Sequence, residues 1–153
     1  MIDRVPVENP ALLSEGIALL KCGLWSPGRL IEWASRKLPH ESRMLPLAVL
    51  SPGATRADVE DALREVAEAH TEVAMPDAPT AARLASGLVA RAWLEGAIST
   101  IDASRMIVEI SEEGRFLAER YSELYAWLDE MDDYPGNLEA VETKLEEILT
   151  SLA

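Results

Sequence analysis

The residues best able to bind a metal or to catalyse a reaction in this sequence are two histidines, His40 and His70, and one cysteine, Cys22. A di-iron or di-manganese site in a helical bundle uses Glu-x-x-His pairs, which place a carboxylate and an imidazole one turn apart on one face. Lys37 and Ala67 stand three residues before the two histidines, so this pair does not occur. A single cysteine cannot form an internal disulfide, and no second metal ligand lies close to Cys22 in the sequence. We therefore expect no metal site, and we interpret His70 as a boundary residue at the end of a helix.

Motifs for nucleophilic catalysis and for nucleotide cofactors do not occur either. There is no Gly-x-Ser-x-Gly elbow, and the cysteine has no histidine context that would activate it. The eight glycines are scattered, mostly near expected helix ends, and form no loop that could hold a phosphate. The acidic run at residues 129–133 lacks the alternating carboxylates of a calcium loop, because Met131 falls at a ligand position. We predict a protein that is not an enzyme and that uses no cofactor.

The charge of the chain excludes two classes of partner. Its 153 residues include 14 Lys and Arg against 27 Asp and Glu, a formal net charge of −13. A polyanion repels the phosphates of nucleic acids and the headgroups of anionic lipids, so we expect neither nucleic acid nor membrane as a partner. The single cysteine fits a reducing compartment. No basic and apolar leader opens the sequence, and no apolar run reaches the length of a membrane span, so we expect a cytoplasmic protein.

Most of the net negative charge falls within residues 109–147, where 13 acidic and 3 basic residues give a net charge of −10. All three tyrosines, the only phenylalanine and Trp127 lie in the same segment. Acidic and aromatic side chains together are typical of a surface that binds a basic protein. The predicted partner-binding residues are Phe116, Arg120, Glu123, Trp127, Asp129, Glu130, Asp132, Asp133 and Tyr134. The alternative is that these acidic side chains only solvate the outer faces of helices.

The elements that must position these residues are helices. Helix-start signals such as Asn9-Pro10 and Ser26-Pro27, together with apolar residues at helical spacing, predict an all-α fold. We expect a compact bundle of about six to seven helices, paired as αα-hairpins. The segments expected to be helical are residues 10–22, 27–38, 43–50, a helix capped by Thr55 that runs to His70, 80–97, a short helix from Thr100 or Asp102 to about 113, 113–131, and 138–152 capped by Asn137.

The segment at residues 80–97 is apolar nearly all round, so we expect it to be the central helix of the bundle. Arg91 and Glu95, which lie four residues apart on this helix, are expected to form a structural ion pair. Residues 1–153 are interpreted as a single helical domain. Two prolines within residues 75–79 mark the best candidate for a linker between two halves.

Two segments resemble a known class of protein. Residues 23–34 read G-L-W-S-P-G-R-L-I-E-W-A, and residues 125–135 read Y-A-W-L-D-E-M-D-D-Y-P. Both resemble segments of small uncharacterised bacterial helical proteins of the toxin-immunity type. The resemblance implies an acidic cytosolic protein of one domain that binds and neutralises a cognate toxin. It carries over no catalytic residue, because such families have no catalytic motif.

These observations lead to one main hypothesis and two alternatives. The main hypothesis is a non-enzymatic cytosolic protein-binding protein, an immunity or antitoxin-like inhibitor that presents its acidic C-terminal helices to a basic partner such as a nuclease-type toxin. The first alternative is a helical regulatory or scaffold module that forms homo-oligomers through the flank of Phe116 and Trp127. The second is an enzyme whose site is assembled from scattered carboxylates. The sequence leaves the partner and the oligomeric state open.

Overall fold

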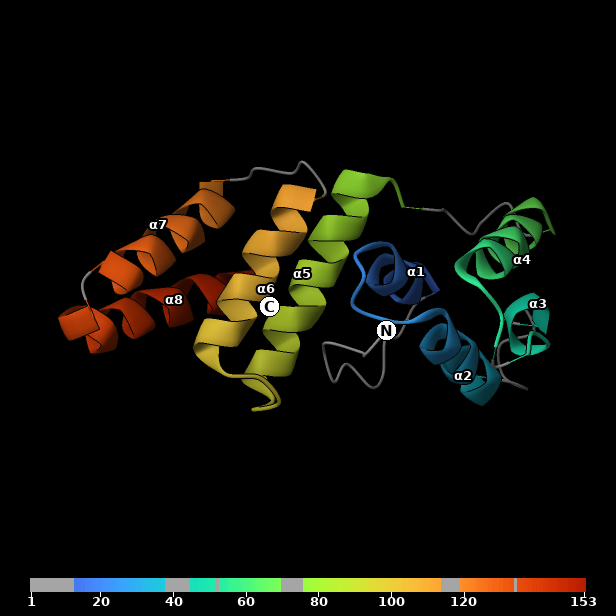
Figure 1. Cartoon of the computed structure of the whole chain (residues 1–153), viewed down its shortest axis with the longest axis horizontal. Coiled ribbons are helices and arrows are strands. Elements are labelled where there is room, and N and C mark those ends of the chain that lie inside the picture. The colour runs from blue at the N-terminus through green and yellow to red at the C-terminus, as the bar shows by residue number, and fades with distance from the viewer. Residues whose placement is uncertain (1–12, 38–44, 52, 70–75, 114–118, 134) are drawn as a thin grey trace.

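The computed structural model describes residues 13–37, 45–51, 53–69, 76–113, 119–133 and 135–153, and within these ranges the fold is all-α without strands. The helices of the described ranges are α1 (Leu13–Lys21), α2 (Pro27–Lys37), α3 (Leu45–Ala48), α4 (Arg56–Ala69), α5 (Ala78–Leu94), α6 (Thr100–Glu113), α7 (Glu119–Asp133) and α8 (Leu138–Leu152), with a 3-10 turn, η2 (Pro135–Asn137), before α8 (Figure 1). The predicted all-α class is confirmed. The predicted cap at Asn9 and both histidines lie outside the described residues.

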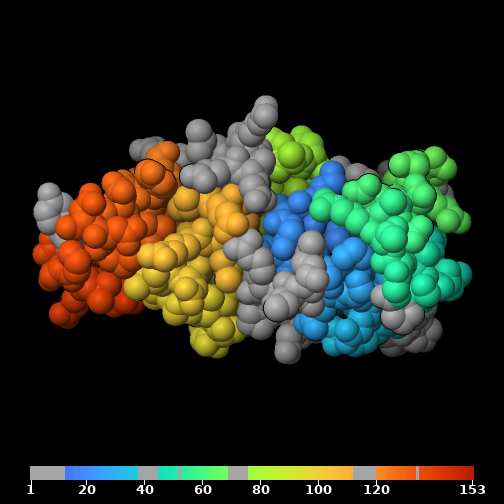
Figure 2. All heavy atoms as spheres, in the orientation of Figure 1, coloured from blue at the N-terminus to red at the C-terminus, as the bar shows by residue number. Residues whose placement is uncertain are grey.

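Helix α5 lies at the centre of the fold, as its apolar sequence predicts. It packs against α1 on one side and against α6 and α8 on the other (Figure 1). The hairpin of α7 and α8 forms one end of the molecule, and α3 and α4 form the opposite end with α2. The space-filling view shows these two ends separated by the central helices (Figure 2). Leu94 is exposed at the C-terminal end of α5, so the core does not bury every apolar side chain of this helix.

The hydrophobic core contains buried side chains from α1 to α8. Helix α5 contributes mostly small residues to it, namely Ala81, Ala82, Ala85, Ser86, Ala90 and Ala92. Small side chains allow neighbouring helices to approach closely, which fits a helix that is covered on several sides. The core beside α2 is built from large residues instead. The Trp25 and Trp33 rings meet edge to face there, with their centroids 5.9 Å apart.

Helices α1 and α5 end in the same way, at Gly23 and Gly96. Both glycines have positive φ values, 71° and 81°, which residues with a Cβ rarely adopt. In each case the amide of the next residue donates to a carbonyl five positions back, at 2.9 Å in α1 and 3.0 Å in α5. This is the Schellman arrangement, and it satisfies carbonyls that the helix leaves without partners. It explains why α5 ends at Leu94 rather than at residue 97, as we expected.

Side-chain caps start α4 and α5, among other helices. Thr55 and Asp58 form a capping box at α4, in which the Thr55 amide donates to Asp58 Oδ2 at 2.9 Å and the Asp58 amide donates to Thr55 Oγ1 at 3.2 Å. The predicted Thr55 cap is therefore confirmed. At α5, Asp77 accepts a hydrogen bond from the Thr80 amide at 2.9 Å. Hydrogen bonds from the Thr80 side chain and backbone lower the pKa of Asp77, because they favour the ionised carboxylate.

The candidate linker at residues 75–79 belongs largely to the start of α5. Asp77 is the cap of this helix, and Ala78 and Pro79 lie in its first turn. Pro76 is buried, and its carbonyl accepts a hydrogen bond from Lys21 Nζ at 2.8 Å. Met75 lies outside the described residues. The Lys21–Pro76 hydrogen bond therefore joins the end of α1 to the start of α5. Pro79 is compatible with α5, because proline is well tolerated in the first turn of a helix.

One expected helix boundary is wrong. Residue 113 is the last residue of α6 rather than the first of the following helix, and α7 begins at Glu119. Helix α6 begins at Thr100, one of its two expected starts, and Ser99 caps it, since Ser99 Oγ accepts from the Asp102 amide at 3.2 Å. Apolar spacing identifies both helices correctly, but it does not specify where a chain turns between two helices that share a core.

The cap expected at Asn137 is also wrong. This residue precedes α8, but its side chain makes no capping hydrogen bond. Its backbone, with φ −100° and ψ 15°, is not in the extended conformation that directs a cap side chain toward the first turn. The 3-10 turn η2 imposes this conformation. Leu138, the first residue of α8, is exposed beside this turn, whereas Leu149 is buried.

Arg91 pairs with a residue of α1 and not with Glu95, the partner that we expected. Arg91 Nη2 of α5 lies 2.9 Å from Glu15 Oε2 of α1. The Glu15 side chain is only 7% exposed, whereas that of Arg91 is 54% exposed. Glu95 instead caps the C-terminal end of α5 through its backbone. A buried carboxylate requires a compensating donor, so this tertiary partner outweighs a local one on the helix surface.

We predict that Gly16→Ala destabilises the protein by about 1–3 kcal/mol, because overpacking displaces rigid core groups. A Cβ at Gly16 would lie 2.8 Å from Cζ3 of the buried Trp33 ring and 3.2 Å from Leu30 Cδ1. Gly87→Ala is the matched control, since its Cβ would meet nothing nearer than 3.6 Å. The control should raise the free energy of unfolding by up to about 1 kcal/mol through helix propensity. Urea unfolding of both variants measures the difference, and equal effects would contradict this packing.

We also predict that Arg91→Ala lowers the free energy of unfolding by about 1–3 kcal/mol, because it removes a charge-assisted hydrogen bond to a buried carboxylate. Arg64→Ala is the control. Arg64 pairs with Asp61 at 3.1 Å on the exposed surface of α4, where both side chains are about 70% exposed, so its removal should cost less than about 0.5 kcal/mol. Urea unfolding distinguishes the two variants. A cost for Arg91→Ala no larger than the control would show that the α1–α5 ion pair contributes little.

Candidate functional site

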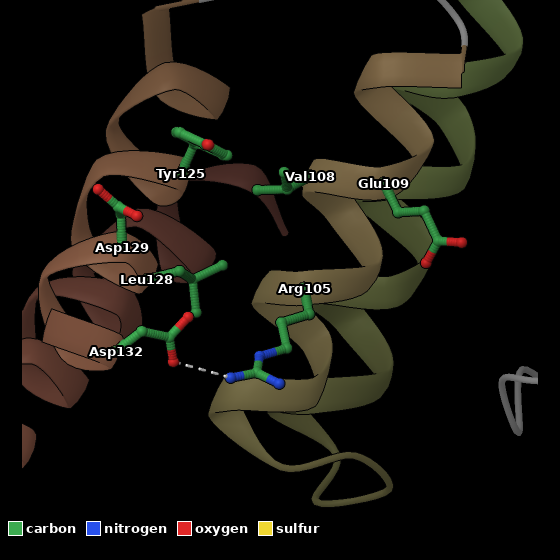
Figure 3. A pocket seen from close by; sticks show the side chains of 7 residues that line it. All are labelled: Arg105, Val108, Glu109, Tyr125, Leu128, Asp129 and Asp132. Atoms are coloured by element: carbon green, nitrogen blue, oxygen red, sulfur yellow. Dashed lines mark hydrogen bonds and ion pairs between the residues drawn. The ribbon is translucent and has the colours of Figure 1, made fainter. Parts of the chain in front are cut away.

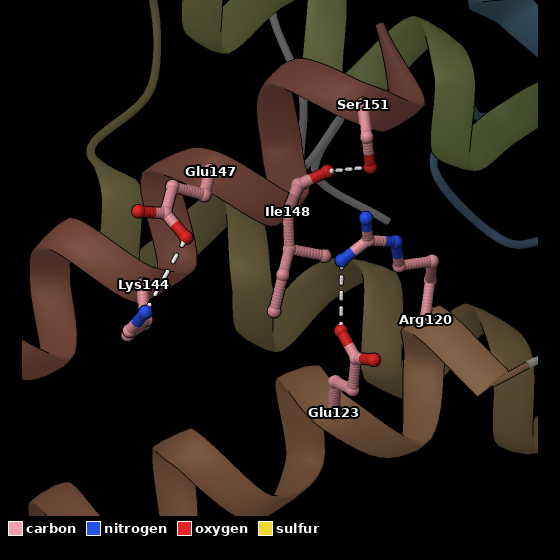
Figure 4. A network of polar contacts seen from close by, with 6 residues as sticks. All are labelled: Arg120, Glu123, Lys144, Glu147, Ile148 and Ser151. Atoms are coloured by element: carbon pink, nitrogen blue, oxygen red, sulfur yellow. Dashed lines mark hydrogen bonds and ion pairs between the residues drawn. The ribbon is translucent and has the colours of Figure 1, made fainter.

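Helix α7 contains seven of the nine residues predicted to bind a partner. Its buried stripe consists of Tyr121, Leu124, Leu128 and Met131. At about 100° per residue, the predicted residues fall on two flanks of this stripe. The flank toward α6 contains Asp129 and Asp132 (Figure 3). The flank toward α8 contains Arg120 and Glu123 (Figure 4), and the helical spacing adds Trp127 and Glu130 to it. The predicted residues therefore do not form one continuous surface, because the core stripe separates them.

Asp133 lies on neither flank of α7. It is exposed, and at about 100° per residue it points away from both α6 and α8. Trp127 is partly buried and packs against the hydrophobic core. Phe116 and Tyr134 lie outside the described residues. Trp127 thus has a structural role in the fold that its position at the edge of the stripe does not reveal.

The flank of α7 that faces α8 is occupied by ion pairs. Arg120 Nη1 lies 2.8 Å from Glu123 Oε2, and across from it Lys144 Nζ lies 3.6 Å from Glu147 Oε2 on α8 (Figure 4). Each carboxylate in these pairs already has a cation beside it. These pairs are exposed, so a basic partner could displace the cation at small cost, and ion pairing alone does not rule the flank out. The exposed ring of Tyr125 lies on the other flank, which makes this flank the weaker candidate for binding.

The flank of α7 that faces α6 borders a groove of about 280 Å³. We call it the α6–α7 groove. Its lining residues are Arg105, Val108, Glu109, Tyr125, Leu128, Asp129 and Asp132 (Figure 3). Arg105 Nη2 of α6 approaches Asp132 Oδ1 of α7 at 3.4 Å and connects the two walls near one end of the groove. The Tyr125 side chain is 56% exposed, the most exposed aromatic ring among the described residues.

The α6–α7 groove combines an apolar surface with excess negative charge. Three carboxylates and one guanidinium line it, and apolar contact comes from Val108, Leu128 and the ring of Tyr125. The methylene stem of a lysine or arginine could lie along the apolar groups while its charged end reaches Asp129. An arginine could also stack on the Tyr125 ring. The groove is thus suited to a cationic side chain of a protein.

The geometry offers less for catalysis. Within the described ranges no cluster of three or more His, Cys, Asp or Glu side chains could hold a metal ion. Cys22 is partly buried just after α1, far along the chain from the groove. None of the helices described is both long enough and apolar enough to cross a membrane. We take the α6–α7 groove as the candidate functional site, because it brings the predicted residues Asp129 and Asp132 beside the exposed ring of Tyr125.

Of the seven residues that line this groove, only Asp129 and Asp132 are among the predicted site residues, and the five that were missed include Tyr125 and Arg105. Tyr125 could have been found, because Tyr125, Asp129 and Asp132 follow one another at spacings of four and three and so share one side of α7. Arg105 could not have been found in this way. It lies 27 residues from Asp132, and only the packing of α6 against α7 brings the two together.

Comparisons of this chain with models of protein families, with curated proteins and with solved structures found no match. The resemblance to toxin-immunity proteins therefore stays a prediction from two short segments. A functional assignment has to rest on the groove, its charges and its exposed groups.

Proposed function

We propose that this chain is a non-enzymatic protein-binding protein that inhibits a basic partner protein, in the manner of an immunity or antitoxin protein. The observation that carries the proposal is the α6–α7 groove, where exposed Tyr125 lies beside the carboxylates of Asp129 and Asp132. Aromatic groups act as anchors in protein interfaces, and complementary charge selects the partner. A basic toxin of the nuclease type has the charge that such a surface would select.

The distribution of charge supports the same proposal. The net charge of −10 within residues 109–147 covers α7, α8 and the end of α6. A field of one sign on one end of a molecule accelerates encounter with a partner of opposite sign, and salt screens it beyond roughly 8 Å at physiological ionic strength. Steering by this end would bring a basic partner to the groove before close contacts form.

A cation of the partner protein could replace Arg105 in its ion pair with Asp132. This ion pair is exposed, with both side chains more than half accessible. Exposed pairs of this kind contribute at most about 1 kcal/mol, so a cation of the partner can replace Arg105 at small cost. The displaced guanidinium remains in the groove, where it can pair with an acidic group of the partner. Binding would then retain charge balance at the centre of the interface.

The first test concerns steering. The partner is captured from a native lysate on the immobilised full chain, identified by mass spectrometry and purified for kinetics. Asp129→Lys with Asp132→Lys should slow association by about tenfold or more at low salt, because both changes reverse charge at the groove. Glu139→Lys with Glu146→Lys changes the net charge equally on exposed positions of α8 and should slow it by no more than about threefold. Equal slowing by both pairs would contradict a role for this groove.

The second test concerns anchoring. Tyr125→Ala should raise the dissociation rate by roughly 30-fold, the effect of an interface anchor worth about 2 kcal/mol, and should leave the association rate nearly unchanged. Trp127→Ala should instead lower the free energy of unfolding, because this ring packs against the core. Leu138→Ala, at an exposed position of α8, is the control for loss of surface area. Unchanged dissociation after Tyr125→Ala would place the anchor elsewhere.

If no partner is captured and the purified chain self-associates in sedimentation experiments, the homo-oligomeric scaffold is favoured instead.

A further inference from the structure

A second groove is lined by residues of α3 and α4 and by the residues that follow α3. Helices α3 and α4 lie at the opposite end of the molecule from α7 and α8 (Figure 1). We call this second groove the α3–α4 groove, and its volume is about 480 Å³. One wall is apolar and contains Leu45, Val49 and Leu50, from α3 and the residues that follow it. The other wall is acidic and contains Asp58, Asp61 and Glu65 of α4. None of the proposed partner-binding residues of α7 contributes to it.

The apolar wall is unusually accessible. Val49 is 70% exposed and Leu45 is 53% exposed, although both are large aliphatic residues. Helix α3 has four residues, and it buries Leu47 completely in the core. A helix this short can direct only one side toward the core, so its other apolar side chains remain in contact with water. Apolar surface exposed within a groove gains free energy when a partner covers it.

The acidic wall has a regular geometry. Asp58, Asp61 and Glu65 stand at spacings of three and four residues, so they form one stripe along α4. At a rise of about 1.5 Å per residue the stripe extends over roughly 10 Å, close to two helical turns. Among the described residues that line the groove there is no Lys or Arg. Arg64, which pairs with Asp61, lies at the outer edge of the stripe and is exposed.

We infer that the α3–α4 groove is a docking site for a cationic amphipathic helix of a partner protein. The apolar side of such a helix would cover Leu45 and Val49. Lysine or arginine residues spaced one turn apart along its edge would meet the stripe of carboxylates on α4, with their stems against the apolar wall. This inference is independent of the α6–α7 groove and assigns a second binding surface to the chain.

The charges of the chain favour a cationic helix over a second copy of the chain as the occupant of this groove. The net charge of −13 makes one copy repel another, and the groove adds three carboxylates at the contact itself. Juxtaposed like charges oppose association at an interface. A cationic helix meets the opposite situation, since both the charge and the apolar surface of the groove favour it.

The test uses the full-length chain and a synthetic probe. The probe is an 18-residue peptide of leucine and lysine at helical spacing, carrying a fluorescent label. A peptide of the same composition with leucine and lysine strictly alternating is the first control, and a leucine and glutamate peptide at helical spacing is the second. Fluorescence anisotropy should show saturable binding of the helical lysine peptide, at least tenfold tighter than either control. Equal affinity for the alternating peptide would overturn the inference.

Matched variants locate the site. Asp61→Lys with Glu65→Lys should weaken binding at least tenfold, whereas Glu60→Lys with Glu68→Lys should weaken it by less than about threefold. The second pair makes the same change of charge on exposed positions of α4 that do not line the groove. Val49→Ser should weaken binding without changing its dependence on salt. Equal weakening by the two charge pairs would mean diffuse attraction only and would overturn the inference.

Two further measurements complete the test. Asp61→Asn with Glu65→Gln provides a milder pair if the lysine variants lose helicity by circular dichroism, and it should still weaken binding. Amide chemical-shift changes caused by the peptide should cluster in α3 and α4. Changes confined to α6 and α7 would overturn the inference, and they would leave the proposed function of the α6–α7 groove intact. Failure of the tests at Tyr125 and Asp129 would conversely leave this docking site intact.

Discussion

The contact between α1 and α5 holds the two halves of the described fold together. Arg91 donates to the buried carboxylate of Glu15 across this contact, and Lys21 donates to the Pro76 carbonyl just before α5 begins. Gly16, on the same helix as Glu15, allows Trp33 of α2 to approach the backbone of α1. Helix α1 is thus clamped between α2 and α5 by a close approach and by hydrogen bonds. Both grooves depend on this arrangement, because it fixes the helices that carry them at opposite ends of the molecule.

Negative charge and partial exposure of apolar groups recur together in this protein. In the α6–α7 groove, Tyr125 lies beside Asp129, and in the α3–α4 groove, Val49 and Leu45 face the carboxylates of α4. Acidic side chains alone would be explained by solvation of helix surfaces. Apolar groups left accessible beside them are not, because exposure of such groups opposes folding and favours association. This combination is the physical basis for interpreting the chain as a protein that binds basic proteins.

Ion pairs decide which acidic residues remain accessible to a partner. On the α8 side of α7, Arg120 neutralises Glu123 at 2.8 Å, so the negative charge there is already satisfied locally. On the α6 side, Arg105 lies 3.4 Å from Asp132, and both side chains of this pair are more than half exposed. All these residues lie close together in the sequence. Their carboxylates differ in how readily they can pair with a cation of a partner, because helix packing gives each carboxylate a different neighbour.

The sequence by itself determined the all-α class, the central place of α5, the Thr55 cap of α4 and the buried stripe of α7, because these follow from periodicity and local hydrogen bonds. It also determined where the acidity lies. Only the tertiary structure decided that Arg91 pairs with Glu15 rather than with Glu95, that Trp127 packs against the core, and that Arg105 meets Asp132. These outcomes depend on contacts between residues far apart in the chain, and a linear pattern contains no information on which helix faces will meet. Burial then selects among the partners available, since a buried carboxylate requires a donor and an exposed one does not.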